Sequence, residues 1–134
     1  MDYTYRRGDI CWFQDPEVGR NSYVKHGDRP VVIVSPDNNN LYNGLVIIVP
    51  LVEANMEKRL YPGQFDIIFN SRRWRVDCYQ IRVTDKSNLL APTARMNNST
   101  LDRLDEALED VLGLVYEDSS ANVYLADEAP EGGV

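Results

Sequence analysis

The sequence predicts a small, mainly β (α+β) domain that ends in an amphipathic helix. The chain has 134 residues, which is a common size for a single domain with one core. Short apolar runs rich in Val and Ile alternate with segments rich in Gly, Pro, Asn and Asp, which is typical of strands and turns. Towards the C-terminus the apolar spacing changes to that of a helix, so a helix is expected to follow the sheet.

Each predicted strand is a short apolar or β-branched run bounded by turn residues. The runs are too short for helices, and their β-branched content favours buried strands. The predicted strands are residues 10–13, 31–34, 45–51, 64–69 and 74–83. The predicted connections are a long loop over 14–28, turns at 38–40 and 43–44, a polar loop over 53–63 and a turn at 70–73. Residues 84–87 are predicted to leave the sheet.

The C-terminal helix is predicted from apolar residues that fall on one helical face. These residues are Leu101, Leu104, Leu108, Val111 and Leu112. Ser99 and Asp102 resemble a capping box in which Asp takes the place of Glu. Gly113 supplies a residue suited to end the helix. The apolar face is expected to pack on the sheet or on a partner.

Taken alone, the net charge of −7 and the pI near 4.6 argue against nucleic-acid binding, for which a basic surface is expected. Five of the 21 acidic residues lie in residues 115–134, which contain no Lys or Arg, so the remaining β-rich part is closer to neutral. We expect residues 117–134 to form an acidic, partly disordered tail. The chain has no apolar run long enough to cross a membrane, and its N-terminus lacks the apolar stretch of a signal peptide. A cytoplasmic protein is therefore expected.

Cysteine and histidine usage indicates neither a disulfide framework nor a metal centre. Cys11 and Cys78 each lie within an apolar strand-like run, and two buried, reduced thiols are expected. One histidine and two distant cysteines match no known zinc-ligand spacing. No metal and no other cofactor is predicted.

Five motifs in order along the chain resemble those of the MazF/PemK toxins. They are Arg-Gly-Asp-Ile at 7–10, Arg-Pro-Val-Val-Ile-Val-Ser at 29–35, Gly-Leu-Val-Ile-Ile-Val-Pro at 44–50, Gln-Ile-Arg-Val-Thr-Asp-Lys at 80–86 and Leu-Asp-Glu-Ala-Leu at 104–108. The resemblance covers roughly residues 6–115 and implies a toxin domain over residues 1–116. The implied fold is an SH3-like, PemK/CcdB-type β-barrel with a C-terminal helix. The implied activity is metal-independent cleavage of single-stranded RNA by a homodimer that an acidic antitoxin neutralises.

RNA cleavage without a metal uses the 2′-hydroxyl of the substrate as the nucleophile. The protein has to accept one proton, supply another and stabilise negative charge on the phosphoryl oxygens. An arginine suits the last role, because its guanidinium stays charged and binds two oxygens at once. Arg29 matches the catalytic arginine of the family motif and lies where a long loop meets a strand. The alternative is a surface ion pair with Asp28 or Asp37.

Two positions depart from the pattern of the family. The family carries a second catalytic residue, Ser or Thr, where this chain has Val52, and Glu53 beside it is expected to point to the opposite face. Relatives often carry an acid where this chain has Tyr79. Asp77 is expected on the same strand face as Tyr79, so we predict Asp77 as the base and Tyr79 as an acid or stacking group. The alternative is that both are solvated strand residues.

Further polar residues are candidates for binding RNA. These are Lys25, His26, Gln80, Arg82, Arg72 and Arg73. Gln80 and Arg82 are expected to share a strand face, where packing or a dimer contact is an equal alternative. His26 is suited to proton transfer near neutral pH, although an ordinary surface role is more common. Arginines beside Trp74 are suited to binding phosphates while the ring stacks a base, the alternative being a solvated turn beside a core Trp74.

Three functional readings stay open from the sequence. The first is an active endoribonuclease, favoured by the motifs around Arg29 and Gln80. The second is a catalytically degenerate toxin-fold protein that binds RNA, or a protein such as gyrase in the manner of the related CcdB toxins, favoured by Val52 and Tyr79. The third treats residues 122–133 as an acidic segment that blocks the RNA groove of its own chain.

Overall fold

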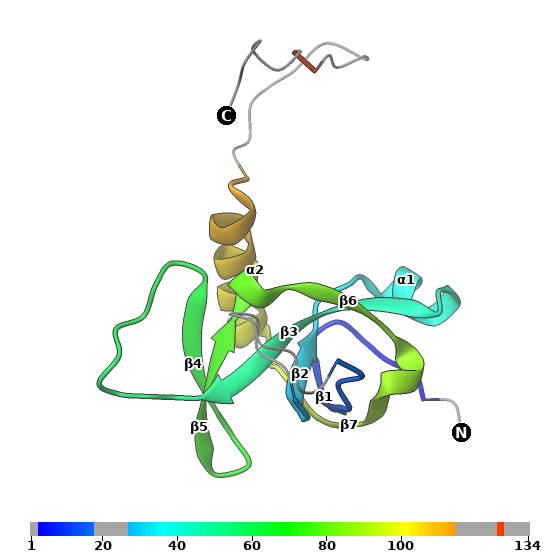
Figure 1. The fold of residues 1–134 in the computed structure, drawn as a ribbon, viewed down its shortest axis with the longest axis horizontal. Coiled ribbons are helices and arrows are strands. Elements are labelled where there is room, and N and C mark those ends of the chain that lie inside the picture. The colour runs from blue at the N-terminus through cyan, green and yellow to red at the C-terminus, as the bar shows by residue number, and fades with distance from the viewer. Residues whose placement is uncertain (1–2, 18–26, 115–125, 128–134) are drawn as a thin grey trace.

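The computed structural model describes residues 3–17, 27–114 and 126–127. The predicted tail, residues 117–134, lies outside the described residues except for positions 126 and 127. Figure 1 shows the strands in a curled sheet, with one long helix against it and a loop that projects between β3 and β4. The elements in chain order are β1 (Asp9–Phe13), β2 (Arg29–Ile33), α1 (Asp37–Tyr42), β3 (Leu45–Glu53), β4 (Gln64–Phe69), β5 (Arg72–Asp77), η1 (Cys78–Gln80), β6 (Arg82–Asp85), η2 (Lys86–Asn88), β7 (Leu89–Arg95) and α2 (Asn98–Leu112).

The sheet is antiparallel at each pairing and is organised around β3. Its strand order is β4-β5-β3-β2-β1-β7, and β6 also pairs with β3. The first part of β3 pairs with β6, from Leu45 to Ile48, and its last part pairs with β5, from Leu51 to Glu53. The edge of β3 therefore passes from one partner strand to the other, and this change of partner curls the sheet.

Alternation along the strands gives the sheet two separate apolar cores. One core joins residues such as Val32, Leu51 and Val76 to Leu104 and Ala107 of α2. The other core lies on the opposite face, where the curled sheet encloses its own side chains. Its members are Tyr5, Cys11, Phe13, Val31, Ile33, Val46, Ile48 and Leu89. Neighbouring strand residues point to opposite faces, so Val31 and Val32 belong to different cores.

The C-terminal helix and the β4–β5 hairpin confirm expectations from the sequence. Helix α2 runs to Leu112, and Gly113 ends it in the left-handed conformation with φ of 63°. The hairpin turns through Asn70 and Ser71, both at positive φ, as the tight turns of hairpins require. The predicted turn at 70–73 is too long, because Arg72 already pairs with Phe69 in β5.

The predicted strand over 74–83 is wrong in its second half. Strand β5 ends at Asp77, and residues 78–80 form the 3₁₀ turn η1 before β6 begins at Arg82. The Asp77 carboxylate causes this change, because it accepts a hydrogen bond from the backbone N–H of Tyr79 and so caps the turn. Residues 84 and 85 were expected to leave the sheet but pair with β3 as part of β6.

Three further local expectations are corrected. Residues 37–42 form the short helix α1 in place of turns at 38–40, because the side chain of Asn40 is buried and bonds to Ser35. Strand β7 was not predicted, since Pro92 interrupts its apolar pattern. Helix α2 is capped by Asn97, whose side chain accepts from the N–H of Thr100, and not by the predicted capping box at Ser99.

Candidate active site

A groove of about 460 Å³ opens on the face of the sheet opposite α2, where β2 begins and β3 ends. We call it the Arg29 groove. Its lining residues are Arg29, Val52, Glu53, Asn55, Lys58, Arg59, Tyr61, Gln64, Arg75 and Asp77. Four strands and the loop between β3 and β4 contribute to it, so it depends on the curl of the sheet. Arg29 and Asp77, two of the predicted catalytic residues, thus line one groove.

Strand register places three lining residues of the groove, Arg75, Val52 and Arg29, in one row across the sheet. Asp66 pairs with Arg75, and Arg75 pairs with Val52. The pairing of Val31 with Pro50, continued by two residues, sets Arg29 opposite Val52. The family position that carries Ser or Thr is therefore beside the predicted catalytic arginine, although this chain has an apolar residue there.

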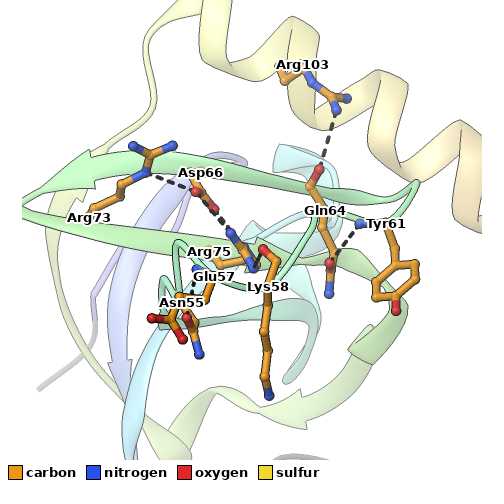
Figure 2. A network of polar contacts seen from close by, with 9 residues as sticks. All are labelled: Asn55, Glu57, Lys58, Tyr61, Gln64, Asp66, Arg73, Arg75 and Arg103. Carbon is orange, nitrogen blue, oxygen red and sulfur yellow. Dashed lines mark hydrogen bonds and ion pairs between the residues drawn. The ribbon is translucent and has the colours of Figure 1, made fainter.

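Beside the lining residue Arg75, an acidic residue that does not itself line the groove holds two arginines in place (Figure 2). Nε of Arg75 donates to Oδ1 of Asp66 at 2.9 Å, and Nε of Arg73 donates to Oδ2 at 3.0 Å. Burial raises the pKa of Asp66, but hydrogen bonds and charge from Arg75 and Arg73 outweigh it, so the pKa lies below its usual value. The hydrogen bond to Asp66 raises the pKa of Arg75, which burial opposes. Asp66 therefore remains a carboxylate at neutral pH.

The loop between β3 and β4 forms the outer wall of the groove. Nη1 of Arg75 donates to the backbone oxygen of Lys58 at 3.3 Å, which ties the loop to β5. Figure 2 shows the Lys58 side chain pointing away from the carboxylate of Asp66. Closer to β4, Oε1 of Gln64 accepts from the N–H of Tyr61 at 3.1 Å. The loop thus brings an ammonium group and a half-exposed phenol to the groove.

Arg29 is the first residue of β2 and is partly buried. Its Nε donates to the backbone oxygen of Gly27 at 3.4 Å. One oxygen of each carboxylate of the alternative reading is bonded to a backbone N–H. Oδ1 of Asp28 accepts from the N–H of Asp15 at 2.9 Å, and Oδ1 of Asp37 accepts from the N–H of Arg7 at 2.7 Å. The geometry supports a guanidinium that faces the groove.

Asp77 is a nearly buried carboxylate at the inner end of the groove, 8% exposed. Its Oδ1 accepts from the N–H of Tyr79 and its Oδ2 from Nε2 of Gln80, each at 3.2 Å. The expectation that Asp77 and Tyr79 share a strand face is wrong, because η1 begins between them. The ring of Tyr79 is 56% exposed, lies against Gly63 and does not line the Arg29 groove. Gln80 donates a hydrogen bond to the Asp77 carboxylate, so its connection to the site runs through the orientation of Asp77.

The predicted RNA-binding arginines have acidic partners. Arg82 approaches Oδ2 of Asp15 at 3.5 Å and Oε2 of Glu17 at 3.8 Å. Arg73 binds Asp66, as described above. The expectation that Gln80 and Arg82 share a strand face is wrong, because Gln80 belongs to η1.

Arg72 lies on the other face of β5 from the groove. It binds Glu53 and places its guanidinium 5.1 Å from the ring centre of Trp74. Lys25 and His26 lie outside the described residues.

Reasoning from the sequence missed most of the groove wall. The missed lining residues are Asn55, Lys58, Arg59, Tyr61 and Gln64, and Arg75 was noted only as a member of the basic cluster around Trp74. The alternation of Arg73, Arg75 and Asp77 within one strand was the available signal, since it sets three charged groups on one face.

The described residues contain no group of three or more His, Cys, Asp or Glu that could hold a metal ion. Among the helices in the described ranges, none is long and apolar enough to cross a membrane.

The curled sheet with its C-terminal helix and the cation-lined groove define a small, mainly β protein with a candidate active site. Residues 6–112 match the family described as PemK-like, MazF-like toxin of type II toxin-antitoxin system. The match covers most of the chain, so the protein belongs to this family.

Relatives and a solved structure agree with this assignment. The endoribonuclease EndoA of Bacillus subtilis is 28% identical over 116 residues, which cover 82% of this chain and 96% of EndoA. The endoribonuclease MazF of Staphylococcus epidermidis is 30% identical over 115 residues, covering 81% of this chain and 92% of that protein. The structure of a mycobacterial endoribonuclease in complex with its cognate antitoxin superposes with a TM-score of 0.67 at 22% identity, covering 84% of this chain and 99% of that one. The predicted PemK/CcdB-type fold is confirmed.

Proposed function

We propose that this chain is a MazF-like toxin that cleaves single-stranded RNA, without a metal, in the Arg29 groove. The family and the relatives named as endoribonucleases support the activity. The observation that carries the choice of site is the position of Arg29, which lines the groove opposite Val52, the place where the family has its second catalytic residue. A guanidinium there is suited to binding the phosphate that is cut.

The proposed reaction is attack of the 2′-hydroxyl on the adjacent phosphorus. The carboxylate of Asp77 takes the proton of the 2′-hydroxyl, the new P–O2′ bond forms, and the P–O5′ bond breaks. Arg29 stabilises the extra negative charge on the phosphoryl oxygens. The products are a 2′,3′-cyclic phosphate and a 5′-hydroxyl that has gained a proton.

A phenol is the proposed source of the proton for the leaving O5′. Tyr79 stays a prediction for this role or for base stacking, although its ring lies outside the groove lining. Tyr61 is the tyrosine that lines the groove, and its 60% exposed ring is within reach of a bound strand. Val52 supplies no proton, which predicts slower cleavage than a hydroxyl at that position would give.

Binding of the strand is proposed to rest on cations around the groove. Lys58 and Arg59 line it from the outer loop and suit phosphate contacts. Lys25, His26, Gln80, Arg82, Arg72 and Arg73 remain candidates from the sequence. Among these, the arginines would have to exchange or share their carboxylate partners to bind RNA.

Two protein partners and a location belong to the same proposal. A toxin of a type II system has an antitoxin, and an acidic one would complement the cations of the groove. A homodimer is supported by Ile47 and Val83, which are cross-strand neighbours and are 39% and 56% exposed. The cytoplasm is the proposed location, because RNA and antitoxin are found there.

Cleavage in EDTA tests the proposed function. Wild type and Arg29→Ala are incubated with a long RNA in EDTA, and the ends of the products are identified by mass spectrometry. Arg29→Lys is the matched variant, since it keeps the charge but not the two-point contact. We expect cyclic phosphate ends from wild type, a loss of about a hundredfold or more in Arg29→Ala, and a partial loss in Arg29→Lys.

The alternative of a toxin-fold protein that binds RNA or gyrase without cutting is not favoured, since the relatives are named endoribonucleases. Intact RNA together with measurable RNA binding in the same experiment would support it. Cleavage that requires added magnesium would contradict the metal-free reaction.

A further inference from the structure

A second pocket, of about 410 Å³, opens on the face of the sheet opposite the Arg29 groove. We call it the tryptophan pocket. Its lining includes Trp12, Pro30, Phe69, Arg72, Trp74 and Thr93. The chain contains two tryptophans, and both line this pocket.

The tryptophan pocket has aromatic walls, and one of its rings is held in place. Trp12 is 41% exposed, which is a large apolar area for a residue of a central strand. Nε1 of Trp74 donates to the backbone oxygen of Phe69 at 3.1 Å, so its ring is held in one orientation. The Arg72 guanidinium lies over that ring and is bonded to Glu53. Rigid aromatic rings beside a cation form a platform for another planar ring.

The pocket and the groove lie on opposite faces of the sheet, near the end where β2 begins and β3 ends. Arg29 and Pro30 are consecutive residues of β2, so they point to opposite faces, one to each site. Glu53 lines the groove and is also the partner of Arg72, which lines the pocket. Strand β2 begins and β3 ends here, and Trp12 is the cross-strand partner of Pro30, so the pocket begins one residue along β2 from the groove.

We propose that the tryptophan pocket is a subsite for a nucleobase of the RNA strand, outside the nucleotides that are cut. The base stacks on Trp12 and Trp74 while the phosphates of the strand remain in the Arg29 groove. The inference rests on the proposed function, since it requires RNA in the groove. An unpaired nucleobase is favoured over a protein side chain because the pocket lies one residue along β2 from a groove lined by cations and itself carries Arg72.

Tryptophan fluorescence tests the subsite, because the emission comes from the two residues of the pocket. The probe is a fluorescein-labelled 2′-O-methyl oligouridylate, which has no free 2′-hydroxyl and is not cut. An abasic oligomer of the same length and charge is the control. Anisotropy of the label reports binding, and an unlabelled copy is used to record the emission. We expect the oligouridylate to quench the emission and the abasic oligomer to bind more weakly without quenching.

Substitutions separate stacking from phosphate binding. Trp12→Ala should weaken oligouridylate binding by about fivefold or more and leave the abasic oligomer unaffected. Trp12→Phe, which keeps an aromatic ring, should retain most of the affinity. Arg29→Ala should weaken both oligomers by similar factors. Circular dichroism checks that each variant is folded, and the emission of the wild type tests the pocket even if Trp12→Ala does not fold.

Three results would overturn the subsite. One is binding of the oligouridylate with unchanged emission, and another is equal affinity for the abasic oligomer. The third is quenching by an acidic peptide that contains one phenylalanine and by neither oligomer, which would assign the pocket to a protein partner. None of these three results contradicts the proposed function, because the cleavage assay in EDTA tests that function separately.

Discussion

Asp66 holds Arg75 by two hydrogen bonds across the β4–β5 hairpin. Nε of Arg75 donates to Oδ1 at 2.9 Å and Nη2 donates to Oδ2 at 3.3 Å. Both side chains are more than nine-tenths buried. Arg75 also donates to the backbone of Lys58, so this pair connects the sheet to the loop that walls the groove. Loss of the carboxylate would leave a buried guanidinium without its main partner.

Asp66→Asn is expected to destabilise the protein by about 3 kcal/mol, because one half of a buried ion pair is lost. Urea unfolding at pH 7 measures the change. Asp102→Asn, at an exposed position of α2, is the control and should change the stability little. Replacing both partners by Asp66→Leu with Arg75→Met should recover much of the loss. A loss below about 1 kcal/mol in Asp66→Asn would show that the pair is dispensable.

The same pair predicts how stability depends on acid. The pKa of Asp66 is lower in the folded protein than in the unfolded chain, so the carboxylate stabilises the fold above the unfolded pKa. This stabilisation is lost as the pH falls through the folded pKa, below about pH 4. Between pH 7 and pH 2 the free energy of unfolding should fall more steeply in wild type than in Asp66→Asn. Parallel curves would contradict the prediction.

Val52→Thr is expected to raise the cleavage rate about tenfold or more, because it adds a hydroxyl opposite Arg29 at nearly constant volume. Single-turnover cleavage in EDTA measures the rate. Val52→Ala is the matched variant that changes the side chain without adding a hydroxyl. Equal rates in the Thr and Ala variants would show that this position takes no part in the chemistry.

Asp77→Asn is expected to slow cleavage by about a hundredfold or more while RNA binding changes little. The amide keeps the shape of the side chain but cannot accept the proton of the 2′-hydroxyl. Single-turnover rates and the affinity for 2′-O-methyl RNA separate the two effects. Glu57→Gln, which removes a carboxylate of the loop outside the groove lining, is the control. A similar loss of affinity in Asp77→Asn would instead assign the carboxylate to a structural role at η1.

The strands with long apolar runs and the helix α2 were predictable from the sequence, because their periodicity is local. Strand β7 was not, since Pro92 and half-exposed residues hide its alternation. The break after β5 depends on one side chain, Asp77, bonding to the backbone of Tyr79. A hydrogen bond of this kind competes with the sheet and leaves no periodic signal.

The candidate site was predictable only where a motif marked it. Arg29 was found through the resemblance, whereas Arg75 was noted only as one of a cluster of arginines and its pairing with Asp66 was not predicted. Its role follows from strand register, which sets it between Asp66 and Val52. Register is fixed by the turn at Asn70 and by the packing of the whole sheet, so the sequence of one strand does not reveal it.

The two cysteines are expected to be unreactive in the folded protein. Both are free and buried, as predicted. Burial, with a nearby carboxylate in each case, raises the pKa of Cys11 and of Cys78 to about 12. Their neutral form stabilises the fold below the unfolded pKa of about 8.5, and this stabilisation is lost as the pH rises towards 12. Iodoacetamide at pH 8 should label both thiols in urea and neither without it, as measured by mass spectrometry. Rapid labelling of the native protein would contradict their burial.

Gly63 is expected to tolerate no side chain, because it sits where the groove wall meets the C-terminal end of α2. Its φ is +88°, and a Cβ there would lie 2.3 Å from Cγ2 of Val111 and 3.1 Å from Cε2 of Tyr79. Its backbone oxygen accepts from the N–H of Cys78 at 3.0 Å, which aligns the loop with η1. A residue that shifted this point would move the neighbouring Gln64 of the groove.

Gly63→Ala should therefore destabilise the protein by about 2–4 kcal/mol, the sum of left-handed strain and overpacking. Gly44→Ala is the matched control, since no atom lies within 4 Å of a Cβ built there. Adding Val111→Ala to Gly63→Ala removes the closest overlap but not the backbone strain, so it should recover only part of the loss. Thermal unfolding measures stability, and cleavage in EDTA measures whether the groove keeps its shape. Full recovery in the double variant would show that the overlap with Val111 alone makes Gly63 necessary.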